Sequence, residues 1–133
     1  MDTIELQLDT SGRAIVDITG DVERFCGGRG DGLCSVFAPH ATAGLALLET
    51  GSGSEQDLVH ALGSLLPRDI RYQHRHGSPG HGADHLLPAL LPPSLVVPVF
   101  GGRPALGTWQ SIVFVDTNRD NPARRVRLSF LAG

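Results

Sequence analysis

The chain has 133 residues, enough to bury the core of one ordinary globular domain. A hydrophobic fraction of 41% with only 19% charged residues excludes a disordered chain, and a formal net charge of −3 excludes the strongly basic surface that binds nucleic acid or anionic membranes. All 11 basic residues are arginines, which excludes both a Schiff-base lysine and a phosphate-binding lysine.

The cysteines and the first residues of the chain indicate a reducing compartment. Cys26 and Cys34 are too few for a disulfide framework, and their spacing matches no common zinc pattern. The first residues lack the basic and then apolar pattern of a signal peptide, and no run approaches the roughly 18 apolar residues of a membrane span. We therefore predict a single cytoplasmic domain over residues 1–133.

Hydrophobic periodicity predicts two strands and a short helix at the start of the chain. Apolar residues alternate with polar ones over residues 3–8 and 14–18, and a Ser-Gly turn separates them, so these strands are expected to form a hairpin. Thr19 offers an N-cap for a helix over residues 22–26, which the glycine-rich stretch 27–32 ends.

The next stretch predicts two buried strands with a histidine between them. Residues 33–38 are apolar almost throughout, which is typical of a central strand covered on both faces, and residues 43–48 form the following strand. Pro39 ends the first run, so His40 is held at the tip between the strands, where an imidazole suits a ligand or a proton carrier. The alternative is a loop histidine in solvent.

The second half of the chain contains helical and strand patterns. Apolar residues at helical spacing predict an amphipathic helix over residues 55–66, on which His60 is expected to be a surface or partly buried residue. Asp84 is expected to cap a second short helix that runs to Leu91. Strands are predicted over residues 94–100, 111–116 and 124–130.

These elements indicate a mainly β protein with short helices, of the α+β class. About seven or eight short strands separated by regular turns are typical of an antiparallel β-sandwich or a jelly-roll-like barrel. The single tryptophan, Trp109, is expected to be a core anchor, with a pocket wall as the alternative.

The stretch over residues 69–85 concentrates imidazole groups. Four of the six histidines lie in it, together with three glycines that indicate a loop. Imidazoles are common metal ligands and, when protonated, bind anions. We favour metal or phosphate binding over the alternative of a solvated polar loop.

Several motifs, in order along the chain, resemble those of the YjbQ-like family. The Pro-His-Ala-Thr-Ala-Gly-Leu of residues 39–45 resembles its His-Thr-Thr-Ala-Gly-Leu segment, and the Tyr-Gln-His of residues 72–74 resembles its Tyr-x-His. His85, followed by the Ser-Leu-Val-Val-Pro of residues 94–98, is similar to its His…Pro-Ser-Leu-x-x-Pro block. The Gly-Thr-Trp-Gln of residues 107–110 is similar to its most recognisable signature.

The resemblance implies a YjbQ-like β-sandwich that assembles as a homotrimer and has a histidine-bearing pocket for a divalent metal, zinc or magnesium. It implies that His40, His74 and His85 converge as the metal ligands. It also implies that His40 and Glu49 are catalytic. The substrate-binding residues that it implies are Thr42, Arg75, Trp109 and Gln110.

The chain also departs from the family pattern. His76 and His81 match no family position and are expected to be variable loop residues. Leu87 stands where a lysine is common, so an arginine such as Arg75 or Arg103 is expected to supply the phosphate contact.

Members of the family are described as secondary thiamine-phosphate synthases. The resemblance therefore implies that a pyrimidine diphosphate is joined to a thiazole phosphate with release of pyrophosphate. The same residues would serve a metal-dependent hydrolase or lyase on a small phosphorylated metabolite, with Glu49 as general base. A third interpretation is a non-catalytic trimer that holds a metal or a metabolite. The expected partners are a small phosphorylated molecule and further copies of the chain, with no nucleic acid and no membrane.

Overall fold

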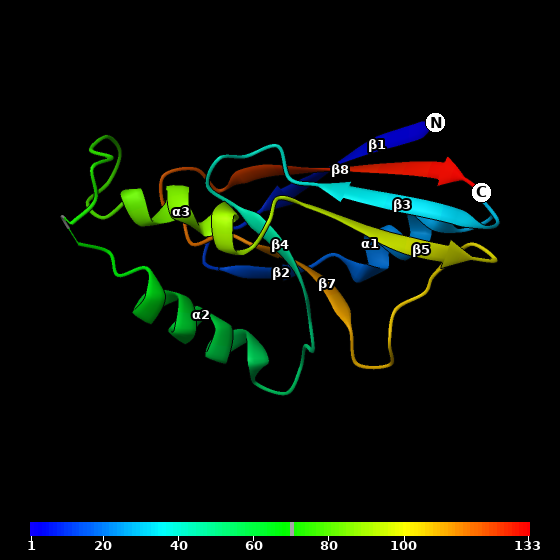
Figure 1. Cartoon of the computed structure of the whole chain (residues 1–133), viewed down its shortest axis with the longest axis horizontal. Coiled ribbons are helices and arrows are strands. Elements are labelled where there is room, and N and C mark those ends of the chain that lie inside the picture. The colour runs from blue at the N-terminus through cyan, green and yellow to red at the C-terminus, as the bar shows by residue number, and fades with distance from the viewer. Residues whose placement is uncertain (70) are drawn as a thin grey trace.

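The computed structural model describes residues 1–69 and 71–133, and within them eight strands and three helices follow one another (Figure 1). The strands are β1 (Asp2–Asp9), β2 (Ile15–Asp17), β3 (Gly32–Phe37), β4 (Gly44–Leu48), β5 (Ser94–Phe100), β6 (Arg103–Pro104), β7 (Ser111–Val115) and β8 (Ala123–Ala132). The helices are α1 (Thr19–Cys26), α2 (Ser54–Leu65) and α3 (Gly82–Leu90). None of these helices has both the length and the apolar character needed to cross a bilayer.

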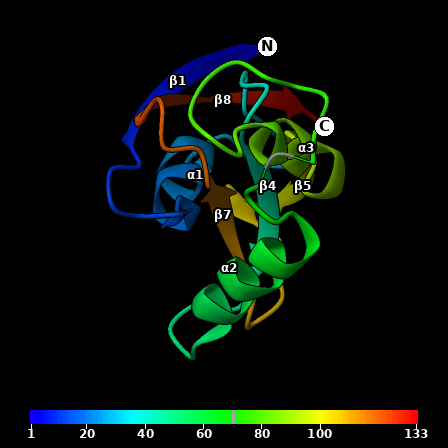
Figure 2. The same cartoon turned by 90° about the vertical axis from the view of Figure 1, so that its left-hand side faces the viewer.

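The strands form two antiparallel sheets. A five-stranded sheet has the order β1-β8-β3-β5-β6, and a three-stranded sheet has the order β2-β7-β4. Figure 2 shows the larger sheet curving over the smaller one, with α2 below them. The predicted mainly β class with short helices is confirmed, and the architecture is a curled sheet and a small sheet rather than a jelly roll of two similar halves.

The main core lies between the two sheets and is closed at one side by α1. Inward side chains from alternate positions of the strands, such as Val36 on β3 and Leu128 on β8, are buried there against Phe114 of β7. Cys26 and Cys34 are free thiols in this core, and burial raises the pKa of Cys34 to about 12. Neither cysteine forms a disulfide, as predicted, and a raised pKa disfavours the reactive thiolate at Cys34.

A smaller apolar cluster covers the other face of the three-stranded sheet. Val113 and Val115 of β7 point away from the main core and pack with Leu62 of α2 and Leu87 of α3. Because both faces of β7 are covered, its residues 112–115 are all buried. This packing holds α2 and α3 at one end of the molecule (Figure 1).

The predicted N-terminal hairpin is wrong. β1 pairs with the C-terminal strand β8, with Leu6 opposite Val126, and β2 pairs with β7, with Val16 opposite Phe114. The two strands bury their apolar faces better against long-range partners than against each other, since each partner already belongs to the core. A local turn signal does not reveal this choice.

Two further predictions need correction. α3 begins at Gly82, so Asp84 lies inside the first turn of the helix and does not cap it. β3 is central, between β8 and β5, but only its inner face is covered, because Leu33 and Phe37 remain partly exposed on the outer face. Phe100, with 64% of its surface exposed, lies on the same five-stranded sheet.

A buried ion pair ties the two sheets together. Arg124 of β8 donates from Nε to Oδ2 of Asp116, at the end of β7, over 2.7 Å, and from Nη2 to Oδ1 over 3.0 Å. The Thr10 hydroxyl donates to Asp116 over 2.7 Å, and the Thr42 hydroxyl accepts from Arg124 over 2.8 Å. The turns that carry Thr10 and Thr42 are thereby joined at one point to the stretch 116–124, and these contacts are called here the Asp116–Arg124 network.

Replacing Asp116 tests the importance of this network. Asp116→Ala leaves the buried guanidinium of Arg124 without its counter-charge, so we expect the free energy of unfolding to fall by about 3–5 kcal/mol. Chemical denaturation followed by circular dichroism measures the change. Glu5→Ala, which breaks the solvent-exposed pair with Arg127, is the control and is expected to have a far smaller effect. Equal effects of the two substitutions would contradict the role given to the network.

Candidate metal centre

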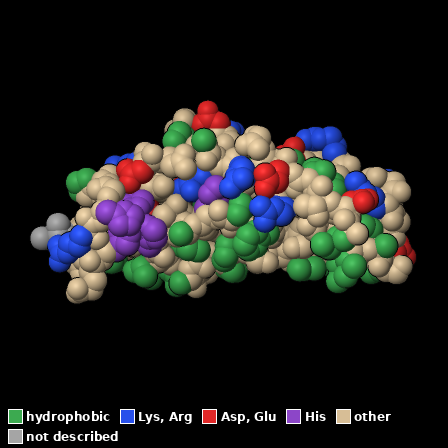
Figure 3. Space-filling view, turned by 90° about the horizontal axis from the view of Figure 1, so that it is seen from above, with side chains coloured by type: hydrophobic (Ala, Val, Ile, Leu, Met, Phe, Trp, Pro, Cys, Tyr) green, Lys and Arg blue, Asp and Glu red, His purple; other side chains and the backbone are tan. Residues whose placement is uncertain are grey.

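Three histidines meet where the loop after α2 enters α3. His81 and His85 lie four residues apart at the start of α3, so their side chains share one face of the helix. His74 comes from the preceding loop and completes the group, and the three candidate ligand atoms lie within 4.8 Å of one another. Figure 3 shows histidine side chains gathered at one end of the molecule. We call His74, His81 and His85 the histidine group.

The loop that supplies His74 is folded by close backbone contacts. Gly77 and Gly80 have φ values of 83° and 80°, which a side chain would strain. Gly82 lies so close to Tyr72 that a Cβ atom there would fall 2.6 Å from the Tyr72 Cβ. The Tyr72 hydroxyl donates to the Pro67 carbonyl over 2.6 Å. These contacts bring the loop back against α3.

The geometry of the histidine group suits a metal ion. Nε2 of His81 lies 3.1 Å from Nε2 of His85, and the rings of His74 and His85 have centroids 4.0 Å apart. Two nitrogen ligands on a tetrahedral zinc lie about 3.3 Å apart, since each Zn–N bond is about 2.0–2.1 Å. Nδ1 of His74 is buried without a hydrogen-bond partner among the described residues, which leaves it available as a ligand atom.

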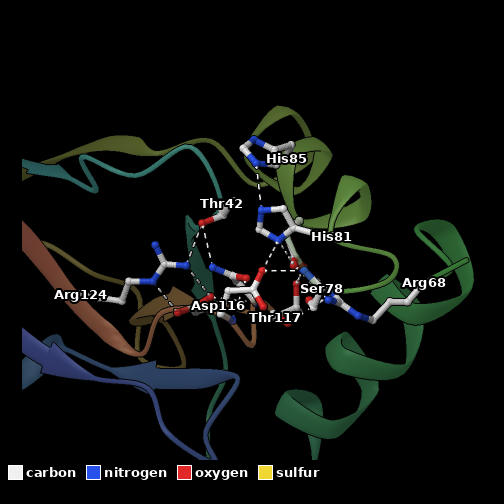
Figure 4. Close-up of polar contacts among 11 residues, drawn as sticks. Thr42, Arg68, Ser78, His81, His85, Asp116, Thr117 and Arg124 are labelled. Atoms are coloured by element: carbon white, nitrogen blue, oxygen red, sulfur yellow. Dashed lines mark hydrogen bonds and ion pairs between the residues drawn. The ribbon is translucent and has the colours of Figure 1, made fainter. Parts of the chain in front are cut away.

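Two carboxylates face the other nitrogen of His81. Nδ1 lies 3.1 Å from Asp120 and 3.3 Å from Asp84, and it is shared between them without the alignment of a hydrogen bond to either. In metal sites a carboxylate behind a histidine fixes the ring and raises its basicity. Asp84 and Asp120 are therefore placed to orient His81 with Nε2 toward His85. Figure 4 shows the contact between His81 and His85.

Asp84 itself is fully buried and needs its own partners. Arg68 donates to it from both terminal nitrogens, one of them over 3.1 Å to Oδ2, and the Thr117 hydroxyl donates over 3.1 Å to Oδ1. These contacts offset the cost of burying the carboxylate. The hydrogen bonds to the Asp84 carboxylate raise the pKa of Arg68, so the guanidinium stays charged.

The histidines are electrostatically suited to act as neutral ligands. Burial lowers the pKa of His74 and His85, and the neighbouring imidazoles lower both further. A lowered pKa keeps the imidazole unprotonated near neutral pH, and this is the form that binds metals.

The structure brings together His74 and His85 but not His40. In the described part of the chain, His40 is outside the histidine group. Its Nε2 accepts a hydrogen bond from the backbone N–H of Arg125 over 2.9 Å, and its ring meets Phe114 edge-on. His40 therefore fastens the β3–β4 turn to the start of β8, and His81, expected to be a variable loop residue, takes the third place in the histidine group.

The other predicted site residues divide between the ends of the three-stranded sheet. Thr42 is buried in the Asp116–Arg124 network at one end. Glu49 is exposed after β4, and Trp109 and Gln110 precede β7 at the other end, since Ser111 pairs with Leu48. Trp109 is 74% exposed, so the core anchor expected for it is wrong. The side-chain oxygen of Gln110 accepts from the Gly107 N–H over 2.8 Å.

Arg75 is the predicted substrate residue that lies beside the histidine group. It lines a hollow of about 310 Å³ together with His74, His76 and His81. An exposed guanidinium next to a candidate metal site can form bidentate hydrogen bonds with phosphate oxygens.

Sequence reasoning missed His81, Asp84, Asp120 and Arg68. A signal for one of them was present, because His81 and His85 are spaced i, i+4, and residues at that spacing share a face when the backbone at both is helical. The prediction placed the cap at Asp84, whereas α3 begins at Gly82 and His81, the residue before it, already has helical φ and ψ of −58° and −23°. Nothing local marks Asp120 or Arg68, since each reaches the site from another element.

Comparisons with known proteins agree with this fold. The profile of a family described as UPF0047 protein YjbQ-like matches residues 3–133. A UPF0047 protein of Mycobacterium tuberculosis is 65% identical over 133 residues, covering 100% of both chains. The crystal structure of a hypothetical protein from Aeropyrum pernix superposes with a TM-score of 0.89 at 33% identity, covering 100% of both chains. An uncharacterised conserved protein of the YjbQ/UPF0047 family from Clostridium acetobutylicum gives 0.85 at 30% identity, over 96% of this chain and 99% of that one.

Metal uptake tests the histidine group. We expect tag-free protein dialysed against zinc to retain about one ion per chain by mass spectrometry, and His81→Ala to lower the affinity at least about 100-fold because it removes a ligand. His40→Ala is expected to retain the metal. His60→Ala, which removes an exposed imidazole on α2, is the matched control. Full metal retention by His81→Ala, or its loss in His40→Ala, would refute the assignment.

The pH dependence of stability tests the role of His40. Burial lowers the pKa of His40, and the nearby Arg124 charge lowers it further. Because the unfolded chain takes up a proton at this position near pH 6.5 and the folded chain only at lower pH, the free energy of unfolding falls as the pH drops through about 6.5. The loss is complete once the pH is below the folded-state pKa.

Urea denaturation at pH 7.5 and 5.5 measures this effect. His40→Asn keeps an acceptor for the Arg125 N–H but does not titrate, so the stability difference between the two pH values is expected to be smaller than in the wild-type chain. His74 and His85 contribute equally to both proteins and cancel in the comparison. An unchanged difference would show that His40 is not held neutral by the fold.

Proposed function

The chain belongs to the YjbQ-like UPF0047 family, and from this premise we propose that it is a metal-dependent enzyme acting on small phosphorylated substrates. The reaction that we propose is the joining of a pyrimidine diphosphate to a thiazole phosphate, the activity that the resemblance implies. The observation that carries the proposal is the histidine group beside the Arg75 hollow. A divalent ion and an arginine together neutralise a departing diphosphate.

The bond changes of this reaction are simple. The ring nitrogen of the thiazole attacks the methylene carbon of the pyrimidine, a C–N bond forms, and the C–O bond to the diphosphate breaks. The electron pair of that bond leaves with pyrophosphate, and no oxidant or reductant is needed. The main requirement on the protein is to hold two phosphorylated molecules and to stabilise charge on the leaving group.

In the proposed reaction, the histidines, the aspartates and Arg75 have different roles. His74, His81 and His85 would hold the ion, which supplies Lewis-acid neutralisation of phosphate charge. Asp84 and Asp120 keep the His81 ring in place, and they act as positioning residues. Arg75 is the group that we assign to the diphosphate. Because the chain has no lysine, arginines must provide every fixed positive charge on the substrate.

Hydrolysis or elimination at the same centre is the second interpretation, and the geometry favours it less. That chemistry needs a general base beside the reacting atoms. Glu49, the base implied by the resemblance, is exposed at the far end of β4 from the Thr42 end of the sheet. Synthase chemistry needs no such base, because no proton is removed when the thiazole nitrogen attacks.

Self-association is also part of the proposal, as a homotrimer of the kind that the resemblance implies. Leu33 and Leu131 face each other on the outer side of the five-stranded sheet, and Phe100 and Val96 are exposed on the same sheet. An apolar surface of this kind is usually covered by another chain. Light scattering at the mass of a single chain would remove this part of the proposal.

Product formation tests the proposed reaction. Tag-free protein is incubated with the pyrimidine diphosphate, the thiazole phosphate and zinc or magnesium, and thiamine phosphate is quantified by chromatography after oxidation to a fluorescent product. We expect His81→Ala to lower the rate at least about 100-fold through loss of the ion, and Arg75→Ala to act mainly by raising KM. His60→Ala is the matched control.

The same incubation separates the alternatives. Release of inorganic phosphate or pyrophosphate without coupling would identify a hydrolase or lyase. A rate unaffected by His81→Ala, or no turnover of either substrate by metal-loaded protein, would contradict the enzymatic proposal.

A further inference from the structure

A larger cavity lies near the ends of α2 and α3, and no histidine among the described residues lines it. Its volume is about 500 Å³, within the range of about 300–1,000 Å³ that small-molecule sites occupy. It is enclosed by α2, by the start of α3, by the turn between β1 and β2, and by the connection between β7 and β8. Neither the resemblance nor the proposed reaction uses this space.

One wall of the cavity is apolar. Leu62 lines it from α2, Leu66 from just after that helix, and Leu87 and Ala83 from α3. Val59 of α2 also lines it and is exposed, and Leu62 is the buried residue of that helix. An apolar body placed here would gain roughly 25 cal/mol for each Å² that it removes from water.

Three arginines also line the cavity. They are Arg13, Arg68 and Arg119. Arg68 donates hydrogen bonds to Asp84, and Nη2 of Arg13 donates one to the backbone carbonyl of Asp9 over 2.8 Å. In residues 1–69 and 71–133 the Arg119 guanidinium has no hydrogen bond or ion pair with another side chain, so all of its donors are available.

The charge around the cavity is positive despite the acidic chain. Among the described residues that line the cavity, Asp116 is the one carboxylate, and Arg124 pairs with it. Asp84 pairs with Arg68, and the Arg13 charge acts on the Asp9 carboxylate, whose pKa is lowered first by hydrogen bonds from Ser11 and then by Arg13. A cavity with an apolar wall and the unpaired guanidinium of Arg119, with Arg13 beside it in the lining, is complementary to an amphipathic anion.

We propose that this cavity binds a small organic anion, an aromatic or short aliphatic body that carries a carboxylate or a phosphate ester. The acidic group lies between Arg13 and Arg119, and the apolar body lies against Leu62, Leu66 and Leu87. The proposal is independent of the metal centre and of the proposed reaction, because none of these five residues contacts the histidine group.

Isothermal titration of the full chain with four probes tests the proposal. Phenyl phosphate and benzoate carry both features, inorganic phosphate carries the charge alone, and benzyl alcohol carries the ring alone. We expect at least one of the two amphipathic anions to bind at least about tenfold more tightly than inorganic phosphate and benzyl alcohol, since the apolar side chains and the arginines both contribute. The ratio of the affinities for phenyl phosphate and benzoate shows which acidic group the cavity prefers.

Gly63 supplies a blocking variant that is expected to fold. It lines the cavity from within α2, and a Cβ atom built on it meets no atom within 4 Å. Gly63→Leu therefore places a side chain in open space and replaces glycine by a good helix former. We expect it to abolish binding of the amphipathic anions. Ala61→Leu, at an exposed position on the same helix outside the cavity lining, is the matched control and is expected to bind normally.

A second pair of variants tests the charge. Arg119→Ala removes the unpaired guanidinium and is expected to weaken anion binding about tenfold, with little effect on benzyl alcohol. Arg103→Ala removes an exposed arginine on β6, outside the lining, and is the control. His81→Ala is expected to leave binding unchanged, which separates the cavity from the metal centre.

The outcomes decide the proposal. Binding that Gly63→Leu abolishes and Arg119→Ala weakens supports it. Absence of binding for both amphipathic anions, binding that persists in Gly63→Leu, equal affinity for benzyl alcohol, or loss of binding in His81→Ala would each overturn it. None of these results depends on whether the chain makes thiamine phosphate.

Discussion

The buried pair between Asp116 and Arg124 is the constraint on which the rest of the structure depends. Two charges in an apolar interior are tolerated only when each has a partner and their remaining hydrogen-bonding groups are satisfied. Here Thr10 and Thr42 help to meet that requirement, so three stretches that are far apart in the sequence must meet at one point. Apolar packing between the sheets would allow small displacements, whereas a directional network fixes how the ends of the strands lie.

The position of the candidate metal centre depends on the segment that follows Asp116. Directly after Asp116, the connection between β7 and β8 places the Thr117 hydroxyl in hydrogen-bond contact with Asp84 and the Asp120 carboxylate beside His81. Asp84 in turn holds Arg68, which follows α2 (Figure 4). A continuous set of polar contacts therefore runs from the core to the histidine group. The loop that bears His74 and Arg75 is placed against this frame.

Two hollows of different character lie near the ends of α2 and α3. The smaller one is lined by His74 and His81 of the histidine group and by Arg75, and it suits an ion with phosphate. The larger one is lined by apolar side chains and by arginines, and it suits an organic anion. Glu49 and Trp109 lie at the opposite end of the three-stranded sheet from the Thr42 end. The motifs that carry the family resemblance thus mark more than one place on the molecule.

The sequence by itself determined the positions of most strands, helix α2, the mainly β class and the concentration of imidazoles before α3. Those features depend on local periodicity and composition, which a short window contains. Only the tertiary structure decided that β1 pairs with β8, that His81 joins His74 and His85, and that His40 binds the backbone of Arg125. Each of these is a choice among partners far apart in the chain, set by which arrangement buries apolar faces and satisfies buried charges together, and no local pattern records it.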